Sequence, residues 1–218
     1  MPEPFTIDVW SDVVCPFCYL GAHQLAAALE RFEHRDEVVI RQRAFELDPN
    51  APPDYGFNLD ELVAHKYGVA LERARTLNQR LESDAAALGM TWSMAQARPS
   101  NTFDAHRLIA LASTQDLGDA TTERLFRAYF CEGTLLSDIA ALIVLAHEVG
   151  VEGTEELFAG DAFSHEVRGD EATAQGLGIS GVPTLLLDSK FMVVGAQGSD
   201  QMLDVLERAW ARRGDLVV

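Results

Sequence analysis

Segments with the pattern of β-strands occur only near the two ends of this 218-residue chain, and about 110 residues of helical pattern separate them. Near the start, residues 5–10 and 38–45 are rich in β-branched and aromatic side chains, and a helical pattern over residues 16–32 lies between them. Two short strands are predicted over residues 183–187 and 191–194, followed by an amphipathic helix over residues 200–212. The first two strands are joined by a crossover helix and are therefore expected to pair in parallel. The two late strands are expected to join them in one sheet with helices on both faces.

The middle of the chain is predicted to be entirely helical. Glycines and Ser/Asp pairs mark the expected helix ends, and the predicted helices are 58–67, 70–88, 102–117, 119–131, 137–149 and 162–176. The expected fold is therefore α/β, a thioredoxin-like fold with a large all-helical insertion domain. Residues 1–50 and 177–218 would form the discontinuous thioredoxin-like domain. Residues 51–176 would form the insertion, with its last helix packing back on the thioredoxin-like part.

The charge of the chain argues against two classes of partner. It carries 34 acidic and 17 basic side chains, a net charge of -17. A field of that sign repels nucleic acid and anionic membrane surfaces, so neither is an expected partner. The first residues lack the basic segment, apolar core and cleavage site of a signal peptide, which makes the cytoplasm the expected compartment. Thiols stay reduced there, so three cysteines do not indicate a disulfide scaffold.

The cysteine pair Cys15 and Cys18 is the strongest chemical feature of the sequence. Two cysteines three apart at a helix start lie on the same helical face, within reach of one S–S bond. Free backbone N–H groups and the positive end of the helix dipole favour the thiolate of the first cysteine. Cys15 is therefore the predicted attacking thiol. Cys18, further into the helix, is predicted to resolve the mixed disulfide.

Two other interpretations of the sequence motifs are weaker. A lone Cys-x-x-C is sometimes half of a zinc site, but the remaining cysteine, Cys131, is predicted on a distant helix, and the six histidines show no ligand spacing. No metal is therefore expected. Residues 176–181 match the letters G-x-G-x-x-G, but a helix precedes them and a strand follows, the reverse of the order that a dinucleotide site needs. Cys131 itself is predicted to be a buried thiol on an apolar helix.

Residues 181–184, Gly-Val-Pro-Thr, open the first of the two late strands. A proline is allowed at the first residue of a strand but not at its centre. Since about 5–6% of X-Pro bonds in folded proteins are cis, the residues alone predict a trans bond before Pro183.

Taken together, these motifs resemble the DsbA-type thioredoxin-fold oxidoreductases, and more narrowly their FrnE-like branch. The resemblance covers nearly the whole chain and is carried, in one order, by SDVVCPFCY at residues 11–19, RPSNTFDAHR at 98–107, LFRAYF at 125–130 and the Gly-Val-Pro-Thr segment. It implies that the Val182–Pro183 bond is cis, that it stands across from the cysteine pair, and that this backbone receives an extended substrate. Pro183 is accordingly predicted to be part of the catalytic site and Val182 of the substrate site.

The same resemblance extends to 2-hydroxychromene-2-carboxylate isomerases and kappa-class glutathione transferases, which typically have a serine where this chain has Cys15. Retention of both cysteines favours redox exchange over glutathione-assisted isomerisation. Asn101 and Phe103 belong to the region that lines the glutathione and substrate cleft in those branches, so they are predicted substrate-binding residues and glutathione stays open as a co-substrate. Phe17 is a further substrate-binding candidate, because with Trp10 and Tyr19 it would form an apolar rim.

The sequence thus predicts a thiol–disulfide oxidoreductase that exchanges disulfides with protein or small-thiol substrates and has no resident cofactor. It would be a monomer or a homodimer. One alternative is a glutathione-dependent isomerase or transferase of an aromatic small molecule. The other is a binding module or chaperone in which the helical insertion holds clients.

Overall fold

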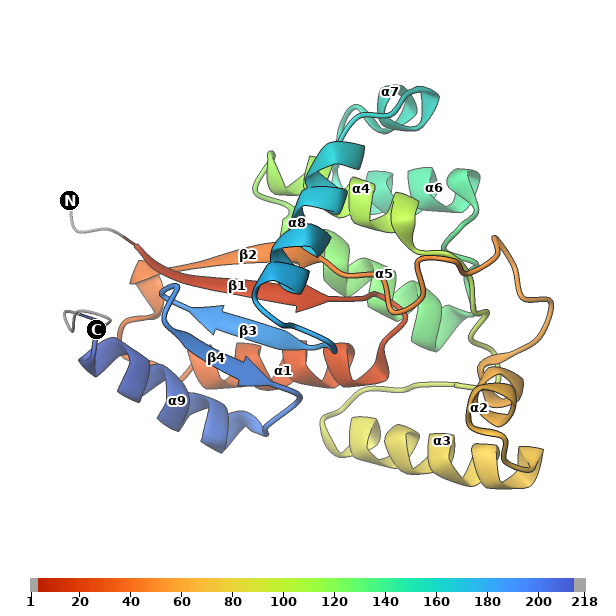
Figure 1. Ribbon diagram of the computed structural model, residues 1–218, viewed down its shortest axis with the longest axis horizontal. Coiled ribbons are helices and arrows are strands. Elements are labelled where there is room, and N and C mark those ends of the chain that lie inside the picture. Colours follow the sequence, from red (N-terminus) through yellow and green to blue (C-terminus); the bar gives the residue numbers. More distant parts are fainter. Residues whose placement is uncertain (1–3, 214–218) are drawn as a thin grey trace. The chain divides into compact units, whose positions relative to one another are not determined.

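The computed structural model describes residues 4–213 and divides the chain into two compact units (Figure 1). Unit 1 comprises Met1–Leu47 and Arg168–Val218, and unit 2 comprises Asp48–Val167. Unit 1 therefore unites the two chain ends. Unit 2 is inserted between them in the sequence and contains only helices and loops among the described residues.

A four-stranded sheet in the order β2-β1-β3-β4 forms the centre of unit 1. β1 (Phe5–Ser11) and β2 (Val38–Ala44) pair in parallel, joined through α1 (Pro16–Leu29) and a short 3₁₀ turn, η1 (Arg35–Glu37). β3 (Thr184–Leu187) pairs antiparallel with β1 and with β4 (Phe191–Val194). In this register Ser11, which precedes the cysteine segment, lies opposite Ala44, and Trp10 lies opposite Thr184.

One face of the sheet packs against two helices, α1 and α9 (Ser199–Ala211) (Figure 1). Alternate side chains of β1 point to this face, as expected for a strand with a period of two. The buried cluster between the sheet and the helices consists of Phe5, Ile7, Leu25, Ala28, Phe32, Leu185, Leu187, Val193, Met202, Leu206 and Ala209. This core fixes the start of α1, and with it the cysteine pair, relative to β3.

The opposite face of the sheet packs against the part of α8 (Ser164–Gly176) that belongs to unit 1. Trp10 forms a second buried cluster with Ala174 and Ile179 on this face. The indole N–H of Trp10 donates to the backbone oxygen of Asp170, 3.0 Å away. The Asp170 carboxylate accepts bonds from the Arg43 guanidinium (3.0 Å) and the Ala44 N–H (3.1 Å). These bonds hold α8 at the end of β2.

Unit 2 contains six complete helices among its described residues: α2 (Leu59–Tyr67), α3 (Leu71–Ala87), α4 (Phe103–Ser113), α5 (Gly118–Glu132), α6 (Ile139–Val149) and α7 (Thr154–Ala159). Their ends follow local chemistry. Asn58 and Glu61 form a reciprocal capping box at the start of α2, and the Asp138 side chain caps α6. Gly68 and Gly150 end these two helices with left-handed backbone that favours glycine.

Helix α5 supplies the largest fully buried side chains of unit 2. Phe126, Tyr129 and Phe130 are buried, and the Phe130 ring stacks on Trp92 with 4.9 Å between the ring centroids. Tyr129 and Phe130 contact each other edge to face at 4.8 Å. The segment LFRAYF, one of the motifs that carry the family resemblance, is therefore a core element of this unit.

The expected fold class is confirmed, with differences at helix ends. α1 ends at Leu29 rather than at residue 32, and α4 ends at Ser113 rather than at 117, because the chain turns through Asp116, whose φ is 59°. α7 is not predicted by the sequence pattern. It has only six residues and follows Gly153, which offers no capping side chain. Among residues 4–213, no helix has both the length and the apolar character needed to cross a bilayer.

Candidate active site

The cysteine segment lies where β1 ends and α1 begins. The Cys15 N–H donates to the Asp12 carbonyl (3.0 Å), which turns the chain, and the Cys15 carbonyl then accepts from the Cys18 N–H (3.1 Å). Cys15 is the residue that caps the helix, and Pro16 occupies the first turn, where its missing N–H costs no hydrogen bond. Two thiols are thereby held at the start of one helix, as the sequence predicts.

The Cys15 sulfur faces the proline loop rather than the first helical turn. Its thiol donates to the Val182 carbonyl across 3.7 Å, and it makes no capping hydrogen bond to the N–H groups of α1. The sequence-based expectation that these N–H groups bind the sulfur is therefore not met in this structure. The family resemblance implies that Val182 and Pro183 stand next to the attacking thiol, and the contact agrees with it.

The Cys18 thiol is buried like that of Cys15, and its own surroundings shift its pKa. Both thiols are free, and the exposed fractions are 4% for Cys15 and 2% for Cys18. Burial, and next the Cys15 side chain with which it shares a hydrogen bond, raise the pKa of the Cys18 thiol well above its usual value. The Ser11 hydroxyl and the Asp12 N–H act in the opposite direction. Cys18 is thus held as a protonated thiol at neutral pH.

The loop before β3 packs directly on α1. The Val182–Pro183 peptide bond is cis, as the resemblance implies, and the Pro183 carbonyl accepts from the Gly195 N–H at 2.8 Å. A Cβ atom at Gly21 would lie 3.1 Å from Cγ of Pro183. Gly21 is therefore a glycine because the proline ring approaches the helix backbone. The sequence analysis did not single it out, although an isolated glycine inside a helical pattern is a signal of such close packing.

We expect Gly21→Ala to slow disulfide exchange, because the added methyl group would push the Pro183 loop a few tenths of an ångström away from Cys15. Small displacements of a reacting geometry are costly, and a loss of about threefold or more is expected. Gly169→Ala is the matched control. It also lies inside a helix of unit 1, a Cβ there would meet open space, and it should gain about 0.5–1 kcal/mol of stability. Single-turnover rates and denaturation curves of both variants measure the difference. Equal rates would exclude a role for this packing.

The predicted apolar rim is only partly present. Phe17 is 50% exposed, whereas Trp10 and Tyr19 are buried in the core of unit 1. Phe17 is therefore the one member of the trio that is available to a substrate. The structure brings Phe17 together with the two cysteines in the first turn of α1, and with Val182 and Pro183 in the same unit.

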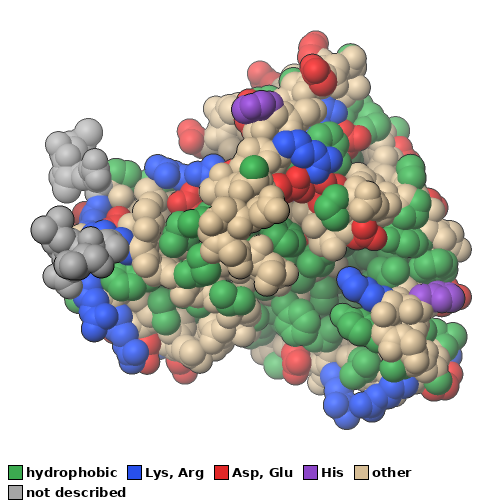
Figure 2. All heavy atoms as spheres, viewed as in Figure 1, with side chains coloured by type: hydrophobic (Ala, Val, Ile, Leu, Met, Phe, Trp, Pro, Cys, Tyr) green, Lys and Arg blue, Asp and Glu red, His purple; other side chains and the backbone are tan. Residues whose placement is uncertain are grey.

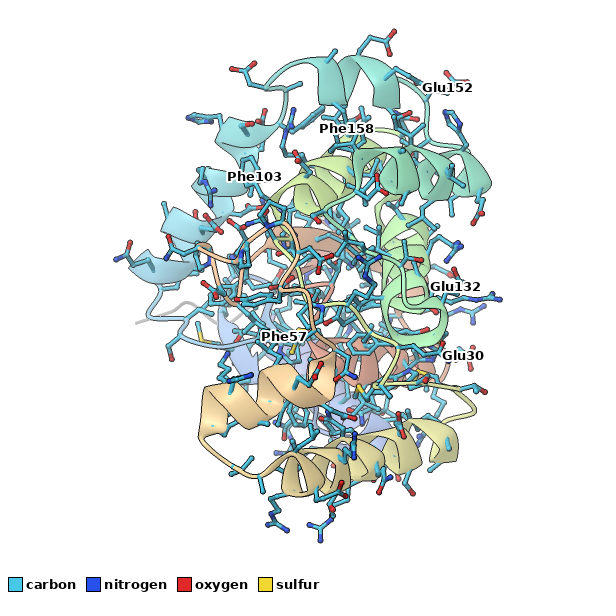
Figure 3. The ribbon with its side chains drawn as sticks, turned by 90° about the vertical axis from the view of Figure 1, so that its right-hand side faces the viewer. Glu30, Phe57, Phe103, Glu132, Glu152 and Phe158 are labelled. Carbon is cyan, nitrogen blue, oxygen red and sulfur yellow. The ribbon has the colours of Figure 1, made fainter. Side chains whose placement is uncertain are left out.

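Asn101 and Phe103 lie in unit 2: Phe103 begins α4 (Figure 3), and Asn101 precedes it by two residues. The Asn101 side-chain oxygen accepts from the Phe103 N–H at 2.9 Å, and the Asn101 N–H donates to the Pro52 carbonyl at 2.9 Å. These bonds shape the chain where α4 begins. A role of the two residues in substrate binding stays a prediction.

A carboxylate pair that the sequence analysis did not detect lies near the cysteine segment. The Arg168 guanidinium bridges Glu46 (2.5 Å) and Glu171 (2.6 Å), and the Glu46 side chain is fully buried. Burial raises the pKa of Glu46, Arg168 opposes this, and the neighbouring Glu171 adds to it. The next residue, Leu47, donates its N–H to the Asp12 carboxylate at 2.7 Å. Glu46 is more than 100 residues from Arg168 and Glu171 in the sequence, so no local pattern predicts that these three side chains meet.

The sequence analysis also considered a metal site, a dinucleotide site and the third cysteine. Within residues 4–213, no cluster of three or more His, Cys, Asp or Glu side chains has the arrangement of a metal site. In the G-x-G-x-x-G segment, α8 ends at Gly176 and β3 begins at Thr184, so the segment lacks the strand-to-helix turn of a dinucleotide site. Cys131 lies half-buried near the end of α5, and burial raises the pKa of its thiol.

A cysteine pair at the start of the helix after the first strand, with a cis-proline loop beside it, defines a thioredoxin-fold protein of the Cys-x-x-C type. The chain belongs to the family of the DSBA-like thioredoxin domain, which matches residues 6–207. The resemblance to DsbA-type proteins that the sequence motifs carry is therefore confirmed.

Solved structures with this fold include one at appreciable sequence identity. The chain is 33% identical to a probable DsbA oxidoreductase, SCO1869, from Streptomyces coelicolor, with a TM-score of 0.92 over 98% of this chain and 93% of that one. A 2-hydroxychromene-2-carboxylate isomerase matches at 17% identity and a TM-score of 0.70, over 98% of this chain and all of the other. The cytosolic disulfide reductase DsbM from Pseudomonas aeruginosa with GSH matches at 22% and 0.64, over 94% and 99%. The similarity to the isomerase and to DsbM shows a shared fold and nothing more.

Proposed function

We propose that this protein is a thiol–disulfide oxidoreductase that works through Cys15 and Cys18. The contact of the two thiols at the start of α1, with the Val182 carbonyl beside Cys15, carries the proposal. Membership of the DSBA-like family and the likeness to a probable DsbA oxidoreductase support it. The substrates would be protein or small-molecule disulfides and thiols, and the protein would work in the cytoplasm.

The reaction needs no resident cofactor. The Cys15 thiolate attacks one sulfur of a substrate disulfide R–S–S–R′, the S–S bond breaks, and R′–S⁻ leaves and takes up a proton. Cys18 then loses its proton and attacks the Cys15 sulfur of the mixed disulfide, which releases R–S⁻. The substrate gains two electrons and two protons, and the protein is left with a Cys15–Cys18 disulfide. A dithiol reductant reverses the change in the protein, and a dithiol substrate is oxidised when all steps run backward.

Equilibration against glutathione redox buffers at pH 7 tests the proposal. We expect two thiols to disappear together and reversibly, with the disulfide mapping to Cys15 and Cys18 by mass. The midpoint should lie nearer the reducing thioredoxins, about -270 mV, than the strong oxidants, about -120 mV. The reason is that Phe17 offers the Cys15 thiolate no hydrogen-bond donor. Failure of the two thiols to pair would refute the proposal.

One outcome of the same experiment would favour the second candidate, a glutathione-dependent isomerase or transferase. The fold shared with 2-hydroxychromene-2-carboxylate isomerase keeps this candidate in view. In that case glutathione would bind tightly while Cys15 and Cys18 stay reduced. The two free thiols in contact favour the redox function instead, because that isomerisation does not require a second thiol.

A further inference from the structure

The segments that meet at the cysteine pair carry no formally charged side chain. Residues 13–29, 172–187 and 191–199 contain no Asp, Glu, Lys or Arg. They meet through the contact of Cys15 with the Val182 carbonyl, the packing of Pro183 on Gly21, and the bond from the Gly195 N–H to the Pro183 carbonyl. Unit 1 therefore offers no cation along these segments for the carboxylates of an anionic substrate.

The charge of the rest of the molecule is negative in both units. Acidic side chains outnumber basic ones by 15 to 9 in unit 1 and by 19 to 8 in unit 2. Figure 2 shows acidic and basic side chains interspersed with neutral and hydrophobic ones over the face in view, so the excess of acidic groups is a property of each unit as a whole. Because each unit is acidic by itself, both units add a net negative contribution to the long-range potential that an approaching ion meets. At about 0.01 M salt the screening length is about 30 Å, so charges well away from the cysteine pair contribute to this potential.

The exposed contact surface that the pair does offer is apolar. Phe17 follows Cys15 by two residues and is half exposed, the partly exposed Pro16 and Val182 have no polar side-chain atoms, and Pro183 is buried. An apolar surface binds apolar groups of a substrate and adds nothing for a carboxylate.

We propose that the site selects disulfides that are neutral or positively charged around their sulfur atoms and flanked by apolar groups, and that it discriminates against oxidised glutathione. Each half of oxidised glutathione carries two carboxylates and one ammonium group, so the molecule is a dianion. Exposed cystines in apolar or basic protein segments fit the site better. This inference rests on the proposed function and narrows its substrate class.

A charge series of small disulfides tests the inference. Cystamine carries two ammonium groups, hydroxyethyl disulfide is neutral and dithiodipropionate carries two carboxylates, while their sizes are similar. Single-turnover rate constants of the reduced protein are divided by those of dithiothreitol with the same disulfide, which corrects for leaving-group reactivity. At about 0.01 M salt we expect cystamine to exceed dithiodipropionate by about tenfold in this ratio. At about 0.5 M salt the difference should fall within about twofold.

Moving one charge into the site gives a second, independent test. Phe17→Lys should raise the rate with dithiodipropionate and with oxidised glutathione by about threefold or more at 0.15 M salt, relative to Phe17→Gln. Val39→Lys is the matched control. Val39 is exposed and pairs with Thr6 in the neighbouring strand, five residues before Ser11. Five residues of a strand span about 16 Å, which separates Val39 from the end of β1 that leads to the cysteine segment. This distance is about two screening lengths at 0.15 M salt. It should have little effect.

The outcomes separate this inference from the proposed function. A rapid reaction with hydroxyethyl disulfide, together with the expected charge order and its collapse in salt, supports both. The same rapid reaction with no charge order, or with oxidised glutathione the fastest of the series, overturns the inference and leaves the redox function standing. Failure of every disulfide to react, while iodoacetamide still modifies Cys15, overturns the redox function and the inference together.

Discussion

Replacement of Cys15 by serine is expected to reduce the rate of disulfide exchange by about a thousandfold or more, whereas Cys18→Ser should keep the first step and accumulate a mixed disulfide. The thiolate is the nucleophile of exchange, and a serine hydroxyl does not replace it at neutral pH. The raised pKa of Cys18 keeps its thiol protonated at neutral pH, so it is suited to the second step and not to the first. Mass spectrometry of the quenched reaction distinguishes the two variants, because only Cys18→Ser should carry one covalently bound half-substrate.

The third cysteine provides the control for this pair. Cys131→Ser changes a half-buried thiol on α5, and its rate should stay within about twofold of the unsubstituted protein. A mixed disulfide that accumulates in Cys15→Ser and not in Cys18→Ser would reverse the two roles. A loss of exchange in Cys131→Ser would mean that the redox pair has been assigned to the wrong cysteines.

The pH dependence separates the two steps of the same reaction. Cys18 must lose its proton before it attacks, and burial is the largest cause of its raised pKa. We expect this burial to persist in the mixed disulfide, where the Cys15 charge is absent. Below that pKa, each unit of pH lowers the thiolate fraction about tenfold. The second step should therefore accelerate as pH rises through the alkaline range. In the unsubstituted protein the mixed disulfide should persist longer at pH 6 than at pH 9, which quench-flow alkylation measures.

Local patterns predict the sheet and the cysteine pair well because their causes are local. The period-two strands, the proline after Cys15 and the glycines that end the helices all act within a few residues, and the structure has these elements close to the predicted bounds. The cis bond before Pro183 is different, since the residues alone favour trans and only the family resemblance implies cis.

Contacts between distant parts of the chain explain what the sequence does not predict. Asp8 and Asp170 both bind the Arg43 guanidinium, yet 162 residues separate the two carboxylates. Charged residues are common in this chain, and nothing in their spacing distinguishes this trio from the solvated majority. The contact of Ser11 with Cys18 is equally hidden, because it depends on how β1 turns into α1. Ser11 acts on the pKa of Cys18, and contacts of this kind become visible only in the folded structure.

Arg107→Met is expected to destabilise unit 2 by about 3 kcal/mol, because it would leave several polar groups without a partner. The Arg107 side chain is 7% exposed, and its guanidinium donates to the carbonyls of Leu157, Gly160 and Ala162 at 2.7–2.8 Å. It also pairs with Asp104 at 2.7 Å. One side chain thus satisfies the end of α7 and the loop that follows, where helical carbonyls have no partner within the helix.

The geometry explains why lysine should not replace this arginine. Three carbonyls in different directions require the fork of N–H donors that a guanidinium has and that a single ammonium group does not reproduce. Arg107→Lys should therefore lose most of the same stability. Hydrogen exchange over residues 154–164 should accelerate in both variants, since this segment would open without global unfolding.

Arg127→Met is the matched control for Arg107→Met. Its side chain is 66% exposed and pairs with Glu132 at 3.4 Å, so its loss should change stability by no more than about 0.5 kcal/mol. Equal effects of the two substitutions would show that the loss of positive charge matters rather than the bonds to the carbonyls. A large effect at Arg107 with normal exchange over residues 154–164 would place the destabilisation elsewhere in the unit. The predicted combination, a large loss confined to this segment, would identify Arg107 as the residue that holds α7 in place.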